Sequence, residues 1–261
     1  MSVQTSASGA HTQVDEILRV RIKFSKQGGE RFLSHLDLLT CVERAIRRSG
    51  VPVAFTEGFH ARIRIGFGPA LALGHASTCE WMDLDLAAPV ASTEIQERLN
   101  RALPGGLRVS SVRFIPSSLP SLQAEIRRAT YRVTVCSRDP EGGTSGEGTS
   151  ADTTTEARPS WIEGLASRIE AFLRQQEIPL LKKNRTVNLR AYVDDVRITG
   201  APERNQGNGC ATLELVLRTG PDGSVRPEEV LGALGPGDEV RVASVERTGL
   251  LAWRNGEWEE P

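Results

Sequence analysis

The feature that most constrains the fold is a series of short segments in which apolar and polar side chains alternate. Residues 18–24, which read LRVRIKF, place apolar residues on one side and basic residues on the other. Residues 61–67 and 81–86 alternate in the same way. A period of two is typical of β-strands with one buried face. The first part of the chain is therefore predicted to form a sheet that buries one of its faces.

Amphipathic helices are predicted between these strands. Ser34 is a good N-cap, and Asp37 three residues later can complete a capping box, so a helix should begin here and run to Gly50. Its apolar residues recur at helical spacing on one face, and its arginines fall on the other. A second helix should begin after Ser92, before a last strand at residues 108–115.

The order of these elements is strand, helix, strand, strand, helix, strand, which is the ferredoxin-like split βαβ arrangement. The second half of the chain repeats this order more loosely. Its predicted strands are residues 130–136, 186–198, 211–218 and 239–247, and its predicted helices are residues 161–175 and 227–234. We therefore predict an α+β protein built from two ferredoxin-like (βαββαβ) domains in tandem.

The composition of the connecting segments sets the predicted domain limits. Residues 17–116 form the first domain and residues 128–250 the second, with 1–16 and 251–261 as tails. Residues 137–160 are rich in Gly, Ser and Thr, which predicts a flexible insertion in the second domain. The chain has no run of about 20 apolar residues that could cross a bilayer. We therefore expect a cytoplasmic protein without a membrane partner.

The four cysteines restrict the chemistry that the chain can perform. Cys41, Cys79, Cys136 and Cys210 lie far apart and form no CxxC pair. We expect them to be reduced and structural, as is usual in a cytoplasmic protein. We therefore predict no metal and no cofactor in this chain. The alternative is a zinc site assembled from distant Cys and His residues.

The net charge is close to zero, but the positive charges are concentrated. The chain has 32 Lys and Arg against 33 Asp and Glu, whereas residues 19–64 have ten basic residues against four acidic ones. In a ferredoxin-like domain the helices cover one sheet face, so cations on the strands should gather on the open face. Such a surface can bind RNA, with cations contacting phosphates and aromatics stacking on bases. The candidate RNA-binding residues are Arg19, Arg21, Lys23, Arg44, Arg47, Arg48, Arg62, Arg64 and Trp81.

The same face has a second interpretation. Asp83 and Asp85 lie on a neighbouring predicted strand and can pair with the arginines. The face would then pack against the second domain or a partner protein. Arginine suits either role, because its planar guanidinium binds phosphate or carboxylate with two hydrogen bonds.

Residues 32–86 also contain a long motif. Its residues are Ser34, His35, Asp37, Glu43, Arg44, Gly58, Phe59 and Gly74. The motif resembles that of the radical-SAM-linked proteins, a bacterial family without an assigned activity that is found beside or fused to radical-SAM enzymes. This resemblance implies a radical-SAM enzyme as partner. A radical-SAM enzyme holds its iron–sulfur cluster with closely placed cysteines, which this chain lacks, so the chain is expected to be a non-catalytic accessory protein.

An alternative function is that of an endoribonuclease that needs no metal. The CRISPR repeat-processing endoribonucleases are also built from tandem ferredoxin-like folds. His35 or His60 would take the proton from a ribose 2′-hydroxyl, and Arg31, Arg62 or Arg64 would stabilise the phosphate. The glycine-rich stretch of such nucleases is not evident.

A departure from the motif weakens a catalytic role for His60, because the motif commonly carries Asn-Pro where this sequence has His60-Ala61.

A further alternative is a protein-only scaffold that docks the radical-SAM enzyme. The sequence favours an accessory protein that holds tRNA or rRNA for this enzyme through a basic sheet face.

Overall fold

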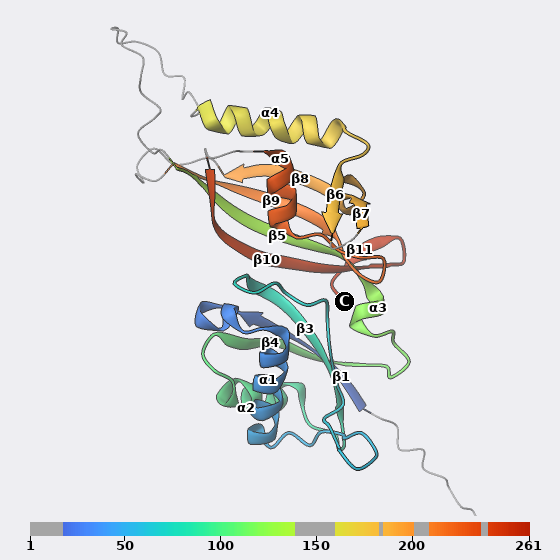
Figure 1. Ribbon diagram of the computed structural model, residues 1–261. Coiled ribbons are helices and arrows are strands. Elements are labelled where there is room, and N and C mark those ends of the chain that lie inside the picture. Colours follow the sequence, from blue (N-terminus) through green and yellow to red (C-terminus); the bar gives the residue numbers. More distant parts are fainter. Residues whose placement is uncertain (1–17, 139–159, 183–184, 201–208, 236–239) are drawn as a thin grey trace, which may run out of the picture.

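The computed structural model describes residues 18–138, 160–182, 185–200, 209–235 and 240–261 (Figure 1). These residues form a mixed α+β fold around a nine-stranded sheet, and two further strands form a small sheet of their own. The predicted α+β class is confirmed. The predicted N-terminal tail and most of the predicted insertion lie outside the described residues.

The N-terminal half contains the predicted strands and helices and, in addition, one short 3-10 helix, η1. In chain order they are β1 (Leu18–Lys26), η1 (Gly28–Phe32), α1 (His35–Ser49), β2 (Ile65–Phe67), β3 (Ala76–Leu86), α2 (Ser92–Ala102) and β4 (Leu107–Ile115). Across the sheet the strands lie in the order β4, β1, β3, β2, and each neighbouring pair is antiparallel.

The C-terminal half follows a short helix, α3 (Leu122–Glu125). Its elements are β5 (Ile126–Ser137), α4 (Ser160–Arg174), β6 (Pro179–Lys182), β7 (Arg185–Asn188), η2 (Leu189–Tyr192), β8 (Val193–Gly200), β9 (Cys210–Arg218), α5 (Pro227–Leu234), β10 (Val240–Arg254) and β11 (Glu257–Glu259). The strands lie in the order β10, β5, β9, β8 with antiparallel neighbours. β6 and β7 pair with each other, and β11 pairs with the end of β10.

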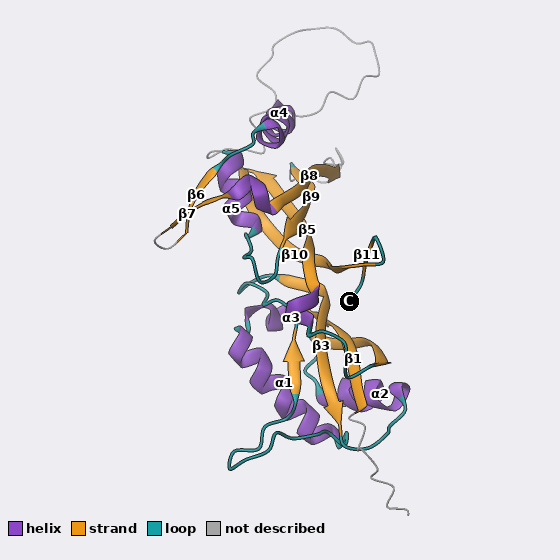
Figure 2. Ribbon diagram, turned by 90° about the vertical axis from the view of Figure 1, so that its right-hand side faces the viewer, coloured by secondary structure: helices purple, strands orange, loops and turns teal. Residues whose placement is uncertain are grey.

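The two halves join where β3 and β10 pair in parallel. Ala76 lies opposite Glu246, and Ser77 lies opposite Arg247. We call this place the seam. It makes one continuous sheet of the two halves, with the C-terminal half above the N-terminal half in Figure 1. In Figure 2, α1 and α5 lie on the left of the sheet, whereas β11 and the C-terminus lie on its right.

Helix α1 begins and ends where the sequence predicts. The Ser34 hydroxyl accepts a hydrogen bond from the Asp37 backbone N–H at 3.2 Å and donates to the Asp37 carboxylate at 2.6 Å. Gly50 follows the helix with φ of 68°, a left-handed conformation that glycine adopts without a steric penalty. The buried face of α1 consists of Leu38, Val42, Ala45 and Ile46.

Each half has its own hydrophobic core, but the second core crosses the seam. In the N-terminal half, α1 and α2 pack on the inward side chains of β1 and β3. In the C-terminal half, α4 and α5 pack on β5 and β9. This second core also contains Leu71, Cys79 and Trp81 from the N-terminal half. The two halves therefore bury apolar surface together, which favours their folding as one unit.

Two predictions for the second half are wrong. The strand predicted at residues 186–198 is interrupted by η2, because the Asn188 side chain accepts a hydrogen bond from the Arg190 backbone N–H and turns the chain. Residues 251–261 do not form a tail, since β10 continues to Arg254 and β11 pairs with it. No helix in the described ranges is both long and apolar enough to span a membrane.

Candidate functional site at the seam

The sheet face of the N-terminal half is closed, so the prediction of an open basic face is wrong for Arg21 and Trp81. Arg21 is 0% exposed and Trp81 is 2% exposed. The Arg21 guanidinium donates to Asp83 at 2.7 Å and to Glu125 of α3 at 2.5 Å. Arg254 of β10 also donates to Glu125 at 2.6 Å. The segment around α3 and the end of β10 therefore cover this face, and Arg21 cannot reach a nucleic acid.

Other predicted RNA-binding cations are also paired with carboxylates. Arg19 and Arg64 both bind Asp85, with N–O distances of 2.7 and 3.1 Å. Lys23 pairs with Glu260 and lies 5.5 Å from the centre of the Trp81 ring. The second interpretation of the sequence, in which Asp83 and Asp85 pair with these arginines, is confirmed. Most of the positive charge on this face is thus neutralised inside the protein.

The predicted RNA-binding residues outside the sheet face are exposed. Arg44, Arg47 and Arg48 lie on the solvent side of α1, and Arg62 lies on the loop between α1 and β2. The Arg47 guanidinium lies 5.7 Å from the ring centre of the half-exposed Phe55. These four arginines are the part of the predicted surface that is still accessible to a ligand.

The motif residues lie at the start of α1 and on loops. Phe59 is fully exposed on the loop before β2, and Gly58 beside it has φ of 108°. Gly74 has φ of 85° and its N–H donates to the Arg31 carbonyl at 3.0 Å, which fixes the loop between β2 and β3 against η1. Arg31 also lies over the Phe32 ring. Glu43 is half-buried on α1.

The structure does not bring His35 and a substrate-sized cavity together. The His35 ring packs edge-on against Phe67, with ring centres 5.8 Å apart. The cavity that His35 shares with Lys26 and Glu80 has a volume of about 10 Å³, which is space for one water molecule. His60 is exposed on the loop before β2. Both histidines are exposed, and a catalytic role for either one stays a prediction.

A buried ion pair lies directly beside the seam. Arg247 of β10 is 1% exposed, and its guanidinium donates to both carboxylate oxygens of Glu80 on β3 at 2.7 and 2.5 Å. It also donates to the Pro69 carbonyl at 2.9 Å. Burial alone would lower the pKa of Arg247, but the Glu80 carboxylate more than offsets this and raises it. Lys26, 1% exposed, donates to the Leu33 carbonyl, and burial lowers its pKa.

A cavity of about 270 Å³ opens at the seam, and we call it the seam cavity. Its buried polar residues are His75, Tyr131 and Arg247, and Arg218 and Arg226 are the exposed cations in its lining. The rings of His75 and Tyr131 are nearly perpendicular, with centres 6.5 Å apart. Burial raises the pKa of the Tyr131 phenol, so its hydroxyl is a hydrogen-bond donor at neutral pH.

A second cavity of about 460 Å³ lies beside the first, and we call it the arginine cavity. Its lining includes Arg127, Arg128 and Arg218 together with Tyr192 and Trp258. The Arg128 guanidinium lies 3.8 Å from the centre of the Trp258 ring. The two cavities share Arg218 and Thr219 in their linings, so Arg218 lies between them.

The pattern of the sequence does not indicate these residues as a site. Arg127, Arg218 and Arg226 lie up to about 100 residues apart in the chain, and each stands at the end of an element or in a turn. The available signal was the position of Arg218 at the end of a predicted strand. Only the pairing of β5 with β9 places Arg128 directly opposite Arg218.

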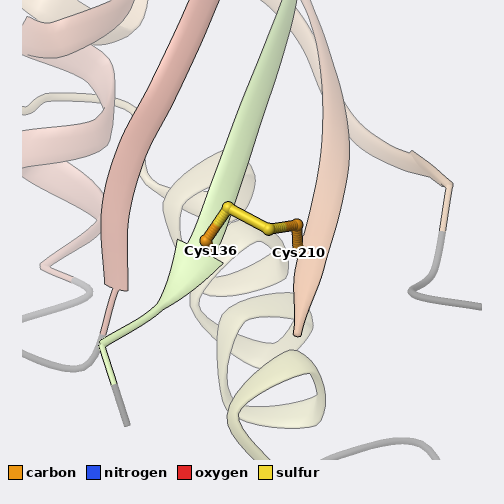
Figure 3. The surroundings of a disulfide bond; sticks show 2 residues. All are labelled: Cys136 and Cys210. Carbon is orange, nitrogen blue, oxygen red and sulfur yellow. A yellow bond between two sulfur atoms is a disulfide. The ribbon is translucent and has the colours of Figure 1, made fainter. Parts of the chain in front are cut away.

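The prediction of four reduced cysteines is wrong for one pair. Cys136 of β5 and Cys210 of β9 form a disulfide with an S–S distance of 2.09 Å (Figure 3). The two residues lie directly opposite in the strand pairing, which their sequence separation of 74 residues hides. Burial raises the pKa of the free thiol of Cys79 to about 12. In the described ranges, no group of three His, Cys, Asp or Glu side chains could hold a metal ion.

These observations define an α+β protein with a large, mostly antiparallel sheet and two cavities, the seam cavity and the arginine cavity, that share Arg218. Residues 19–227 match the family described as "Uncharacterized protein conserved in bacteria (DUF2344)", and the chain belongs to this bacterial family. No curated protein matches the chain.

Several solved structures are distantly similar to this chain. A chain of an H/ACA RNP bound to a substrate RNA is 10% identical with a TM-score of 0.42, over 88% of this chain and 47% of that one. A chain of a Cbf5-Nop10-Gar1 complex is 9% identical with a TM-score of 0.44, over 88% and 48%. An unknown protein from Galdieria sulphuraria is 13% identical with a TM-score of 0.24, over 89% and 99%. The chain spans about half the length of the first two, and at these scores the likeness assigns no function.

Proposed function

We propose that this protein binds RNA in the seam cavity and the arginine cavity and acts as an accessory protein for a radical-SAM enzyme. The observation that carries the RNA part is the shared position of Arg218 in two adjoining cavities that also contain Tyr131, Tyr192 and Trp258. Cations that contact phosphates beside aromatic rings that stack on bases are the usual elements of single-strand binding.

The charges in this region favour an anionic ligand. Arg128 and Arg218 share one carboxylate, Asp194, at 2.5 and 2.8 Å, so two guanidinium groups face a single negative charge. Among the described residues, Arg127 pairs with no carboxylate, and its guanidinium donates to the backbone carbonyl of Ile126. Arg226 is exposed at the start of α5. Arg127 and Arg226 can therefore attract phosphate without the need to break an ion pair, and the carboxylate of Asp222 in the lining of the arginine cavity partly opposes this attraction.

The exposed arginines of α1 extend this proposal. Arg44, Arg47 and Arg48 lie on the helix that Figure 2 shows on the same side of the sheet as α5. Since α5 begins beside the seam cavity at Pro227, an RNA strand that leaves this cavity can continue toward α1. These arginines therefore stay in the proposal, whereas Arg21 and Trp81 leave it because they are buried.

The partner and the domain organisation are supported by different observations. The motif at residues 32–86 supports a radical-SAM enzyme as partner, through the resemblance described above. The strand orders β4, β1, β3, β2 and β10, β5, β9, β8 support the proposal that each half is a ferredoxin-like unit. With the separate β6–β7 pair set aside, both orders place the first and third strands of the half in the centre.

The test is RNA binding by the purified full chain at about 50 mM and about 200 mM salt. The site variant changes Arg127, Arg218 and Arg226 to Ala. For single-stranded RNA we expect weaker binding, and a shallower dependence of log affinity on log salt by about 2, because roughly 0.7 counterion is released for each phosphate contact. Fluorescence anisotropy of an end-labelled RNA measures both quantities.

A matched control variant removes the same charge elsewhere. Arg101, Arg108 and Arg174 are exposed on α2, β4 and α4, away from both cavities, and their change to Ala should leave the salt dependence unchanged. Equal losses in both triple variants would indicate general charge attraction and would contradict the site. Co-purification with the radical-SAM enzyme, with and without RNA, tests the partner. Cleavage of RNA that disappears in His35→Ala or His60→Ala would replace this proposal by the ribonuclease.

A further inference from the structure

We propose that the seam cavity is a pocket for a single nucleotide that is turned out of the bound RNA strand. Its base would enter the cavity, and its phosphate would lie at the exposed guanidinium groups of Arg218 and Arg226. This inference rests on the proposed RNA binding and adds the kind of ligand and its orientation.

The size of the seam cavity suits one base with its ribose. Its volume of about 270 Å³ lies just below the roughly 300 to 1,000 Å³ of ordinary small-molecule sites. A whole dinucleotide cofactor does not fit such a space. The cavity also lies at the joint of two sheet halves, which is a common place for a binding site because both halves contribute to the walls.

The lining matches the two kinds of surface that a base presents. Leu71, Ala129 and Leu217 supply apolar surface for the faces of the ring. The edges of a base carry hydrogen-bond donors and acceptors, and buried polar groups that remain unpaired are costly. The Tyr131 phenol and the Thr219 hydroxyl lie in the lining and can satisfy such groups. The cavity therefore offers both stacking area and partners for the edge of a base.

The floor of the cavity is held in place before any ligand binds. The His75 ring nitrogen Nε2 lies 2.5 Å from a carboxylate oxygen of Glu228, and His75 packs edge-on against Tyr131. The Arg247 guanidinium, which also lines the cavity, is fixed by Glu80 and the Pro69 carbonyl. A pocket with fixed walls loses little conformational entropy on binding, which favours recognition of a small, weakly held group such as one base.

The cations lie where a phosphate would follow the base. Arg218 and Arg226 are exposed, in contrast to His75, Tyr131 and Arg247. Because Arg218 also lines the arginine cavity, the strand on one side of the turned-out nucleotide would continue into that cavity. This arrangement distinguishes a nucleotide of a strand from a free base, which would have no use for the two guanidinium groups.

The test measures binding of uridine 5′-monophosphate and adenosine 5′-monophosphate to the full chain by isothermal titration calorimetry. Ala70 is an exposed residue in the cavity lining, so Ala70→Trp should fill the cavity without disturbing the core. We expect at least about tenfold weaker mononucleotide binding in Ala70→Trp and in Arg226→Ala. The matched control is Ala233→Trp, at an exposed position of α5 outside the lining, which should bind as the wild type does.

The possible outcomes separate this inference from the proposed function. Loss of mononucleotide binding in Ala70→Trp but not in Ala233→Trp, together with weaker RNA binding in the same variant, supports the pocket. RNA binding that depends on Arg218 but is unchanged in Ala70→Trp, without any mononucleotide binding, overturns the pocket and leaves the proposed function standing. Displacement of the mononucleotide by an equal concentration of inorganic phosphate shows an anion site only and overturns the pocket. Mononucleotide binding without RNA binding contradicts both proposals.

Discussion

Arg247 of β10 and Glu80 of β3 form a bidentate ion pair in the interior, next to the place where the two halves of the sheet meet. The Arg247 Nη2 atom lies 2.7 and 2.5 Å from the two carboxylate oxygens. Because one partner comes from each half, the pair links the position of the seam cavity to the pairing of β3 with β10. Removing one partner would leave a charge buried without compensation.

We therefore expect Arg247→Ala to lower the free energy of unfolding by about 3 to 5 kcal/mol, as is usual for a broken buried pair. Urea denaturation followed by circular dichroism measures this loss. The control is Arg132→Ala, which breaks an exposed pair with Glu246 in the same sheet and should cost about 0 to 1 kcal/mol. Equal, small losses in both variants would show that Arg247 and Glu80 do not form a buried pair in solution.

Gly106 and Gly105 provide a second test, of the turn before β4. A Cβ atom on Gly106 would lie 1.9 Å from Glu30 Oε2 and 2.4 Å from the Gln27 carbonyl, whereas a Cβ atom on Gly105 meets nothing within 4 Å. The Gln27 N–H also donates to the Gly106 carbonyl at 2.8 Å, so the backbone cannot move freely. We expect Gly106→Ala to destabilise the protein by about 1 to 3 kcal/mol, and Gly105→Ala to have little effect. Thermal and urea unfolding of the two variants, side by side, measure the difference.

The cysteines should react in a pattern that the disulfide and the burial of Cys79 dictate. The denatured, unreduced chain should show two thiols, from Cys41 and Cys79, and the reduced chain should show four. In the native state, Cys79 should resist alkylation at pH 8, because a pKa of about 12 leaves roughly one thiolate in ten thousand. Mass spectrometry after labelling with iodoacetamide identifies the modified residues. Four thiols in the unreduced chain would contradict the disulfide between Cys136 and Cys210.

The contact between His75 and Glu228 predicts a dependence of stability on pH. Burial would raise the pKa of Glu228, but its hydrogen bond with His75, a backbone hydrogen bond and the nearby charges of His75 and Arg226 together more than offset this and lower the pKa below the ordinary 4.5. A carboxyl group with a lowered folded pKa contributes stability above its unfolded pKa, and this contribution is lost as the pH falls through the folded pKa. The wild type should therefore lose more stability than Glu228→Gln between pH 5 and pH 3.

Urea midpoints of both proteins across this pH range measure that difference. Glu229→Gln is a suitable control, because Glu229 lies on the same helix and pairs with Lys182 instead of His75. Parallel pH profiles of the wild type and Glu228→Gln would show that the carboxylate gains nothing from His75.

The sequence by itself determined the local elements of this protein. Alternation predicted β1, β2 and β3 because a strand exposes successive side chains on opposite faces. The caps at Ser34 and Gly50 predicted both ends of α1 because they satisfy local backbone requirements. The pairing of Asp83 and Asp85 with arginines was one of two interpretations open from the sequence. The register of β1 and β3 decides between them, because it places Arg21 opposite Asp83 and Arg19 opposite Asp85.

The tertiary structure decided which sheet face is open and where the candidate site lies. Arg21 sits on the polar side of an alternating strand, so local pattern alone indicates exposure, but α3 and the end of β10 cover that side. The seam cavity combines residues from the loop before β3, from β5 and from the turn before α5, which no spacing in the chain relates. Long-range strand pairing sets these relationships, and its energy depends on the apolar surface buried between distant segments.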